Sequence, residues 1–188
     1  MIRRPTDIVK TLLEDIVSAG DTVVDATCGN GNDTLILATL AGSSGRVIAI
    51  DSQMSAIEAT REKLASSSGL PTVELNHDSH DNLTQIVGGA RSIRVIVFNL
   101  GYLPGEDTGI VTQPESTTSA IGQALDLIDV DGAVFVTLYP GHAGGSEEAQ
   151  EVDLLVSNLD PKRFSVARYQ WINQSSTHPY VLIFHRRS

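Results

Sequence analysis

The sequence predicts an α/β domain in which a mostly parallel sheet of seven strands carries helices on both faces. Short apolar segments alternate with segments of helical periodicity along most of the 188 residues, which is typical of parallel strands joined by helices. A turn with two glycines follows the first apolar segment, where such sheets place a ligand loop. A short polar loop separates the last two apolar segments, and we expect them to pair as an antiparallel hairpin.

The expected helices begin and end at local signals. Pro5 suits a first helical turn and Gly20 ends that helix. Glu147 and Glu148 in the first turn of the last helix match the helix dipole. In chain order, the expected helices cover residues 5–19, 32–40, 55–67, 82–87, 114–127 and 146–159.

The expected strands are short runs rich in apolar and β-branched residues, as buried strands require. They cover residues 22–26, 47–50, 73–75, 95–98, 133–138, 165–171 and 180–185. Neither a linker nor a repeat interrupts this pattern, so we expect one domain over residues 1–188.

The composition narrows the class of protein. Hydrophobic residues make up 41% and charged residues 19%, and no apolar run approaches the ~18–20 residues that span a bilayer. The net charge of −10 argues against broad binding of nucleic-acid phosphates. A local basic patch remains compatible with that charge, and its candidates are Arg3, Arg4, Lys162, Arg163, Arg168, Arg186 and Arg187.

The single cysteine, Cys28, excludes an intramolecular disulfide and suits a reducing compartment. No secretory signal pattern opens the chain, and we expect a cytoplasmic protein that does not bind membranes. A plastid or mitochondrial location stays open if a longer precursor carried a transit peptide. The oligomeric state is open too, and the sequence is compatible with a homodimer.

Residues 25–33, between the first strand and its helix, are predicted to hold a cofactor. Gly29 and Gly31 let the backbone turn tightly and approach a ligand. Thr34 replaces the third glycine of the dinucleotide fingerprint, and a dinucleotide needs that helix N-terminus for its pyrophosphate. S-adenosylmethionine (SAM) has no phosphate but carries an amino group and a sulfonium cation, which the carboxylate of Asp25 suits.

Polar residues after the next two strands extend this site. Asp51 ends the second strand, twenty residues after Gly31, where a carboxylate can accept both ribose hydroxyls of NAD or of SAM. Gln53 can face the adenosine, and Asp78 can accept the adenine amino group. A helix cap or loop residue is the alternative for each carboxylate. The candidate cofactor residues are Asp25, Gly29, Asn30, Gly31, Asp33, Asp51, Gln53, Asp78 and Asn99.

Residues 99–105 follow the fourth strand and resemble the Asn-Pro-Pro-Tyr motif of amino-methyltransferases. Methyl transfer to nitrogen needs the amine lone pair in line with the sulfonium methyl, so much of the catalysis is positioning. The Asn99 side chain and the Leu100 carbonyl can hold the amine hydrogens, and Tyr102, beyond Gly101, can pack against the base. A turn rich in glycine and proline is the alternative.

Two further loops add polar groups. Tyr139 and His142 follow the fifth strand, and His142 can accept a proton because histidine titrates near neutrality. An ordinary loop histidine is the alternative. Asn173, Gln174 and His178 lie in the final hairpin loop, where polar groups suit the reading of a base.

Two features contain residue types found in other kinds of site, a metal site and a nucleophile. Residues 77–81 contain the ligand types of a metal site, but no second cluster accompanies them, so we expect no metal. Cys28 stands beside Gly29, yet no histidine and aspartate accompany it as a nucleophile's partners, and a small buried residue in a tight turn is favoured.

Together these loops resemble the YtqB-like rRNA methylase family, small bacterial and plant proteins understood as tRNA 5-(aminomethyl)-2-thiouridine methyltransferases. The resemblance implies the Rossmann-like class I methyltransferase fold, SAM as cofactor, and methylation of the aminomethyl nitrogen of a wobble uridine in the tRNA anticodon region. Residues 175–179 depart from the family, which usually carries an asparagine and paired prolines there, and this bears on base recognition. The matching segments are residues 25–34, 51 with 53, 99–105, 139–142, 145, 147–148 and 173–174.

The resemblance also implies roles for individual residues. Asn99, Tyr102 and His142 are the candidate catalytic residues: Asn99 orients a neutral amine, and His142 or solvent takes its proton. The cofactor pocket carries over onto Asp25, Asn30, Asp51, Gln53 and Asp78. The candidate substrate-binding residues are Leu100, Gly101, Tyr102, Tyr139, His142, Asn173, Gln174 and His178.

Three other functions are weighed against this one. A small-molecule methyltransferase fits the acidic surface and a chain without an added RNA-binding domain. The missing third glycine and the hairpin ending count against a NAD-dependent oxidoreductase. The motif loops retain the residue types that a cofactor and a reaction require, which counts against a noncatalytic scaffold.

Overall fold

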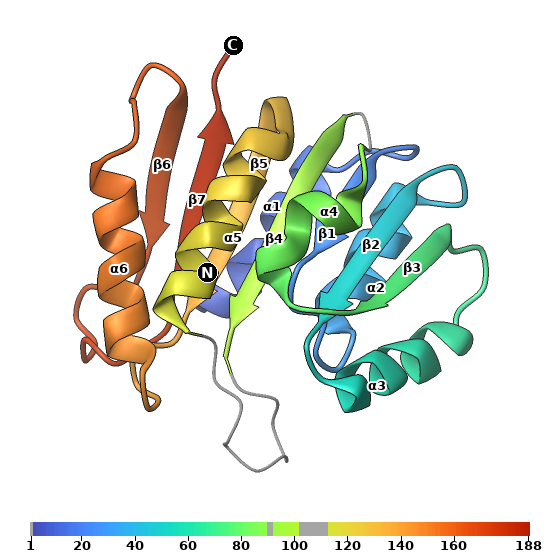
Figure 1. Cartoon of the computed structure of the whole chain (residues 1–188), viewed down its shortest axis with the longest axis horizontal. Helices are drawn as coiled ribbons and strands as arrows, with labels where there is room; N and C mark the ends of the chain where they lie inside the picture. The colour runs from blue at the N-terminus through green and yellow to red at the C-terminus, as the bar shows by residue number, and fades with distance from the viewer. Residues whose placement is uncertain (1, 90–91, 102–112) are drawn as a thin grey trace.

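The computed structural model describes residues 2–89, 92–101 and 113–188, and its seven described strands form one sheet of order β3-β2-β1-β4-β5-β7-β6 (Figure 1). Strands β1 to β5 run parallel, whereas β7 is antiparallel to both of its neighbours. The expected parallel sheet with a closing antiparallel hairpin is therefore confirmed. The strands are β1 (Thr22–Asp25), β2 (Arg46–Asp51), β3 (Thr72–His77), β4 (Ile93–Leu100), β5 (Ile128–Leu138), β6 (Phe164–Tyr169) and β7 (Tyr180–Arg186).

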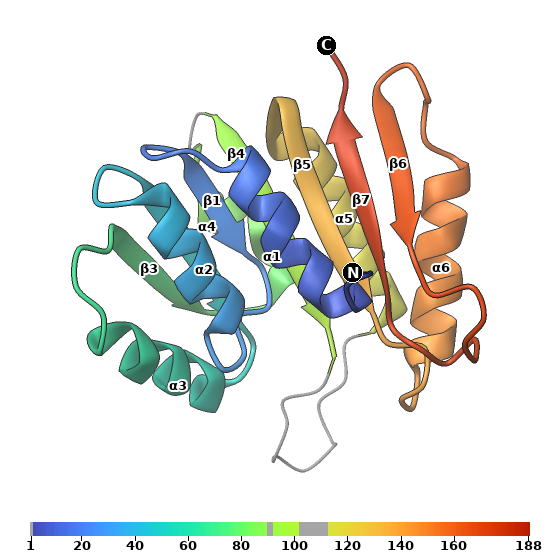
Figure 2. The ribbon, with the colours of Figure 1, turned by 180° about the vertical axis from the view of Figure 1, so that it is seen from behind.

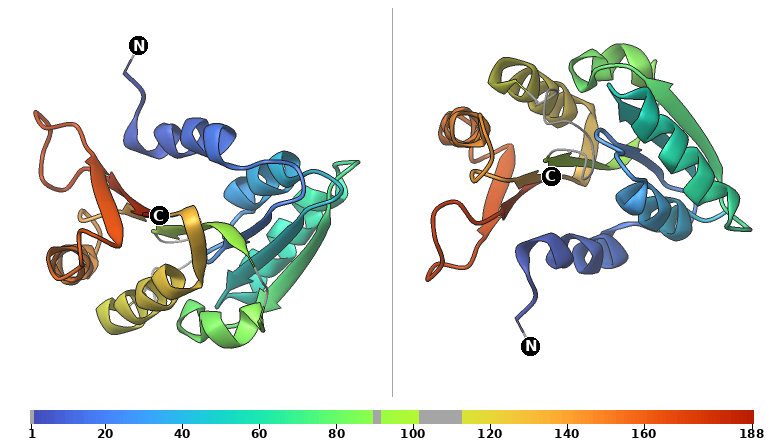
Figure 3. Two further views of the ribbon diagram at one scale, coloured as in Figure 1. Left: turned by 90° about the horizontal axis from the view of Figure 1, so that it is seen from above. Right: turned by 90° about the horizontal axis from the view of Figure 1, so that it is seen from below.

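Helices cover both faces of the sheet, as Figure 3 shows in views along the strands. Helices α1 and α2 lie on the face seen in Figure 2, and α4, α5 and α6 lie on the opposite face. Leu64 places α3 with the α1–α2 layer, because it packs against that half of the core. The helices are α1 (Pro5–Ile16), α2 (Asn32–Ala41), α3 (Met54–Ala65), α4 (Leu83–Val87), α5 (Pro114–Leu127) and α6 (Gly145–Ser157), with a 3-10 turn η1 (His80–Asn82) before α4.

Alternate strand residues divide the core into two layers. In β2, Ile48 and Ile50 join the layer beneath α4, α5 and α6, whereas Val47 and Ala49 join clusters on the opposite face. Because both faces are covered, the central strands consist of nearly continuous apolar runs. The edge at the carboxyl ends of the strands is then the place where polar side chains can meet a ligand.

The structure corrects several expected boundaries. Helix α1 ends at Ile16 and not at residue 19, because Val17 takes an extended conformation with ψ 131°. Strand β4 continues to Leu100, since Asn99 pairs with Thr137 and Leu100 pairs with Leu138 of β5. Asn99 and Leu100, which the sequence placed in a loop, are thus held by the sheet.

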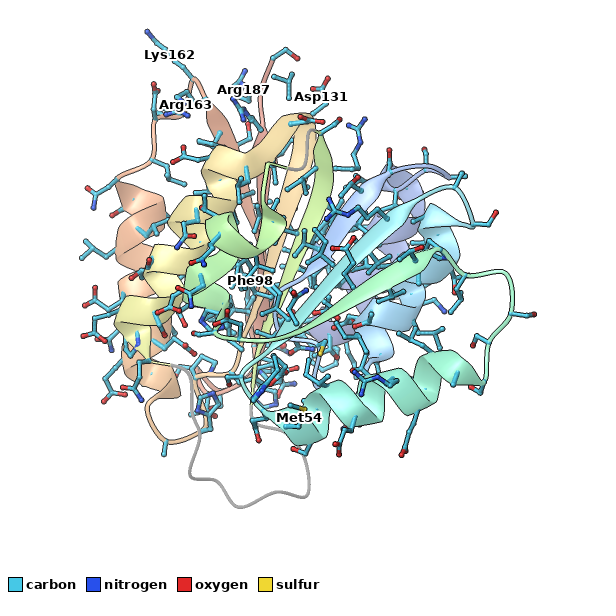
Figure 4. All side chains as sticks on the ribbon, turned by 45° about the vertical axis from the view of Figure 1, so that its right-hand side comes forward. Met54, Phe98, Asp131, Lys162, Arg163 and Arg187 are labelled. Carbon is cyan, nitrogen blue, oxygen red and sulfur yellow. The ribbon has the colours of Figure 1, made fainter. Side chains whose placement is uncertain are left out.

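The switch in strand order between β1 and β4 positions the site. Connections lead outward from β1 through β2 to β3, and outward from β4 to β5 on the other side. Open α/β sheets bind ligands in the crevice at the carboxyl ends of the strands at such a switch point. The C-terminus (Figure 1) and the labelled Lys162, Arg163 and Arg187 (Figure 4) lie at the opposite edge, away from Met54 at the start of α3. The late basic residues therefore do not form one patch beside the crevice. None of the described helices is long and apolar enough to span a membrane.

Candidate active site

The turn after β1 is shaped by Gly31 and closed by α3. Gly31 has φ +73° and is the N-cap of α2. A Cβ on Gly31 would lie 2.9 Å from the Cα of Thr60, so only glycine fits here without a shift. The Thr60 hydroxyl donates to the Gly29 carbonyl at 3.0 Å and ties the turn to α3. Asn30, at the tip of the turn, is exposed.

Asp51 at the end of β2 holds two neighbouring loops. One carboxylate oxygen accepts the Gly29 N–H at 2.9 Å, and the other accepts the Gln53 N–H at 3.0 Å. A carboxylate has about four lone-pair directions, so these bonds leave acceptor capacity for hydroxyls of a ligand. Asp51 is half-buried at the carboxyl edge, which fits the ribose role expected from its place in the sequence.

Asp25 lies deeper than the sequence suggested. Its side chain is fully buried, and its two oxygens accept the Thr34 hydroxyl at 2.5 Å and the Thr27 N–H at 3.3 Å. Burial, with the nearby charge of Asp33 as the second cause, raises the pKa of Asp25 to about 7. Such a carboxylate acts on a bound cation through its charge, because Thr34 and the turn separate it from solvent.

Asn99 is the meeting point of three elements. Its backbone N–H donates to the Thr27 hydroxyl at 2.7 Å, and its side-chain Nδ2 donates to the Asp33 carboxylate at 3.2 Å. Burial raises the pKa of the Tyr139 hydroxyl, the charge of Asp33 acts in the same direction, and a hydrogen bond with Asn99 opposes them. Asp33, Asn99 and Tyr139 thus form one polar cluster at the ends of β4 and β5.

The loop after β5 packs closely against β4. The His142 ring contacts the Leu100 carbonyl through Nε2 at 3.2 Å and the Ala143 carbonyl through Nδ1 at 2.9 Å. A neutral imidazole has one N–H, so it donates to one of these two carbonyls at a time. Gly101 lies against Tyr139, where an added Cβ would meet the ring at 3.4 Å. The candidates Leu100, Gly101, Tyr139 and His142 are therefore brought together.

The hairpin loop between β6 and β7 reaches the same edge. A Cβ on Gly141 would lie 2.9 Å from the Thr177 carbonyl, so the two loops touch. Asn173, Gln174 and His178 are exposed on the hairpin loop. Their use in base recognition stays a prediction.

The remaining candidates are Asp78, Tyr102 and the segment 77–81, which contains the ligand types of a metal site. Asp78 is exposed, and bonds to the Ser79 N–H and to Asn82 lower its pKa, as in the loop-residue alternative. Tyr102 lies outside the described residues. Within the described chain, no group of three or more histidine, cysteine, aspartate or glutamate side chains could hold a metal. His80, one of the two histidines in that segment, is buried and its ring meets the Phe98 ring edge-on.

Sequence reasoning missed two supporting residues. Thr27 and Thr60 fix Asn99 and Gly29 through their hydroxyls, and nothing in their local sequence distinguishes them from other threonines. Met54, the residue after Gln53, exposes 48% of its surface at the start of α3 (Figure 4).

Replacing Gly145 by alanine should disturb the loop that carries Tyr139 and His142. The new Cβ would overlap the Tyr139 carbonyl and lie 2.8 Å from the His142 ring. We expect a loss of about 2 kcal/mol in the free energy of unfolding and at least a roughly tenfold loss of the activity expected from the sequence. Gly122→Ala in α5 is the control, because nothing lies within 4 Å of its Cβ, and it should gain about 0.5–1 kcal/mol. Equal melting temperatures for the two variants would contradict the steric argument.

Comparison with known proteins decides the family. Residues 47–185 match the family described as "Putative rRNA methylase". The chain belongs to this rRNA methylase family. It is 34% identical over 194 residues to the chloroplastic tRNA (mnm(5)s(2)U34)-methyltransferase of Arabidopsis thaliana, covering 99% of this chain and 71% of that protein.

Solved structures of similar chains agree with this assignment to the rRNA methylase family. A "putative rRNA-methylase" from Clostridium thermocellum superposes with a TM-score of 0.94 at 37% identity, over 99% of both chains. A "putative methyltransferase" from Streptococcus mutans, in complex with S-adenosylhomocysteine (SAH), gives a TM-score of 0.87 at 33% identity, again over 99% of both chains. The chain is accordingly a SAM-dependent methyltransferase with the class I fold, and not a NAD-dependent oxidoreductase.

The residues at the crevice fit SAM. The methionine part of SAM carries an ammonium group and a sulfonium, and the half-buried Asp33 and the buried Asp25 supply negative charge near the turn after β1. The raised pKa of both carboxyl groups, caused mainly by burial, indicates a site that a bound cation would stabilise. When bound, SAM supplies an electrophilic methyl group; the protein supplies position and charge.

Proposed function

We propose that this enzyme methylates a nitrogen of RNA, namely the exocyclic aminomethyl nitrogen of 5-aminomethyl-2-thiouridine at the wobble position of tRNA. The observation that carries the proposal is the placement of Asn99. Its backbone is fixed by β5 and by Thr27, and its amide lies beside Asp33 at the carboxyl end of β4. A carboxamide oxygen fixed there can accept an N–H of an acceptor amine and direct the nitrogen lone pair toward the methyl donor.

The surrounding residues would serve the same reaction. Tyr139 borders the site on the side of β5. The carbonyl of Leu100 offers a second hydrogen-bond acceptor for the amine, and the amine would compete with the His142 ring for this carbonyl. A neutral amine becomes a secondary ammonium on methylation and then loses a proton. His142 can hold that proton when its ring is in the neutral form, or solvent can take it.

The surface near the crevice suits a single-stranded nucleotide better than a long duplex. The net charge of −10 limits phosphate contacts, and the exposed hairpin loop offers Asn173, Gln174 and His178 as polar groups for a splayed base. The Tyr169 hydroxyl donates to the Arg3 carbonyl at 2.7 Å, which keeps one basic residue near the end of β6 where the hairpin loop begins. The name of the Arabidopsis relative, a tRNA methyltransferase, supports this choice of substrate.

Mass spectrometry of nucleosides tests the proposal. The protein is incubated with SAM and tRNA that carries 5-aminomethyl-2-thiouridine, and we expect that nucleoside to gain one methyl group. Asn99→Ala should lower the initial rate at least about tenfold, because the amine loses its fixed acceptor. Asn158→Ala is the matched control, since Asn158 is exposed at the end of α6 and bonds only to Leu154 among the described side-chain partners.

Two outcomes would contradict the proposal. Methylation of free amines at a higher kcat/KM than tRNA would replace it with the small-molecule alternative. Transfer to a ring nitrogen or a ribose of the same tRNA would keep RNA as substrate and reject the aminomethyl group.

A further inference from the structure

The backbone of Asn99 is fixed, but its side-chain carboxamide can adopt two orientations. The N–H bond to Thr27 and the pairing with Thr137 hold the main chain on two sides. The carboxamide can still rotate so that either its NH₂ or its oxygen faces Asp33. These two orientations have nearly the same shape and opposite hydrogen-bonding character.

Asp33 distinguishes between the two orientations. Its Oδ2 accepts from Asn99 Nδ2 at 3.2 Å, and an ionised carboxylate can only accept hydrogen bonds. A flipped amide would place its oxygen against the carboxylate, with no hydrogen between them. Tyr139 cannot make this selection, because a hydroxyl both donates and accepts.

The ionised form of Asp33 has its own support. Asp33 stands in the first turn of α2, where the helix dipole favours a negative charge. Burial raises the pKa of Asp33 overall, and the hydrogen bond from Asn99 and the charge of Lys63 on α3 oppose that rise by favouring the ionised form. Lys63 is itself held at this place by a hydrogen bond to Asn32.

We infer that Asp33 is a positioning residue, which orients the Asn99 carboxamide so that its oxygen is presented to the acceptor nitrogen. This role differs from a direct contact to the cofactor, the part that the sequence suggested for Asp33. The inference rests on the proposed function for the identity of the acceptor. The orientation of the amide can nevertheless be measured without any acceptor.

The first test observes the amide directly. Protein labelled with ¹⁵N-asparagine and saturated with SAH gives side-chain NH₂ signals, and the pair that disappears in Asn99→Ala belongs to Asn99. In the parent, we expect one Asn99 proton to exchange slowly with solvent and to shift downfield. In Asp33→Ala, both features should be lost. Unchanged Asn99 signals in Asp33→Ala would overturn the inference.

The second test uses kinetics with tRNA. Asp33→Ala should lower kcat about tenfold at saturating SAM, while the KM for tRNA changes less than about threefold. The isosteric Asp33→Asn can still accept a hydrogen bond from Asn99, but its amide can also donate one. Asp33→Asn therefore no longer favours one orientation of the Asn99 carboxamide and should lower kcat about two- to fivefold. Asp126→Ala, an exposed carboxylate on α5, is the control.

A double variant separates positioning from an independent role. If Asp33 acts through Asn99, Asp33→Ala combined with Asn99→Ala should be as active as Asn99→Ala alone, within about twofold. Additive losses, or weaker SAM binding with unchanged kcat, would assign Asp33 to the cofactor and overturn the inference. If the parent protein does not methylate tRNA, the proposed function fails and the NMR result alone decides the role of Asp33.

Discussion

Asp25→Asn is expected to stabilise the folded protein above neutral pH and to weaken SAM binding at the same time. Asp25 is fully buried, and desolvation raises its pKa from 3.8 to about 7. The folded protein therefore keeps a proton on Asp25 that the unfolded chain releases near pH 4. Between these values the parent loses stability as the pH rises, and above about pH 7 the full cost of a buried charge is present.

An asparagine removes this cost and keeps the local bonds. Its oxygen can accept the Thr27 N–H, and its NH₂ can donate to the Thr34 hydroxyl oxygen. We expect the free energy of unfolding to rise by roughly 2–4 kcal/mol at pH 8 and by almost nothing near pH 4. Urea titrations at both values measure the difference. The exposed Asp126→Asn is the control and should change stability by less than about 0.5 kcal/mol at either pH.

Cofactor binding should change in the opposite direction. A negative charge beneath the turn attracts the sulfonium of SAM, so Asp25→Asn should weaken SAM binding about tenfold at pH 8. SAH lacks the sulfonium charge, and its affinity should fall less. Calorimetry with both ligands checks this. A stability gain that is equal at pH 4 and pH 8, or an unchanged SAM affinity, would show that Asp25 does not carry the charge assigned to it.

The parallel core of the sheet and its closing hairpin could be predicted from the sequence because they depend on local patterns. Alternating apolar runs and helical periodicity identified the parallel core, and the short loop before residue 180 identified the antiparallel hairpin. Asp51 was placed correctly for the same reason, since the end of β2 fixes its position. Strand ends were less accurate: pairing of Asn99 with Thr137 extends β4 beyond its apolar run.

The environment of each site residue could not be predicted in the same way. The depth of Asp25 depends on the packing of Thr34, and the partnership of Asn99 with Asp33 joins residues that are far apart in the chain. Basic residues from the last part of the chain also separate in space. Arg168 pairs with Asp153 and stacks on Tyr180, whereas Arg187 lies at the far edge of the sheet.

Gly31→Ala and Gly69→Ala should differ strongly, although the two glycines have nearly the same φ. Gly31 has φ +73° and Gly69 has φ +74°, so an alanine at either position pays a similar cost of about 1 kcal/mol for the left-handed conformation. Nothing lies within 4 Å of a Cβ on Gly69, whereas a Cβ on Gly31 would meet the Cα of Thr60 at 2.9 Å. We expect Gly31→Ala to lose about 3 kcal/mol in total.

The position of the clash also predicts an effect on the cofactor. The atom in the way belongs to the backbone of α3, so trimming the side chain by Thr60→Ala should not rescue Gly31→Ala. The turn must move instead, which lengthens the bond from Thr60 to the Gly29 carbonyl and the bond from Gly29 N–H to Asp51. SAM affinity should therefore fall at least about tenfold in Gly31→Ala and stay within about twofold in Gly69→Ala. Calorimetry on the two variants decides it, because equal SAM affinities would mean that the turn after β1 does not shape the cofactor site.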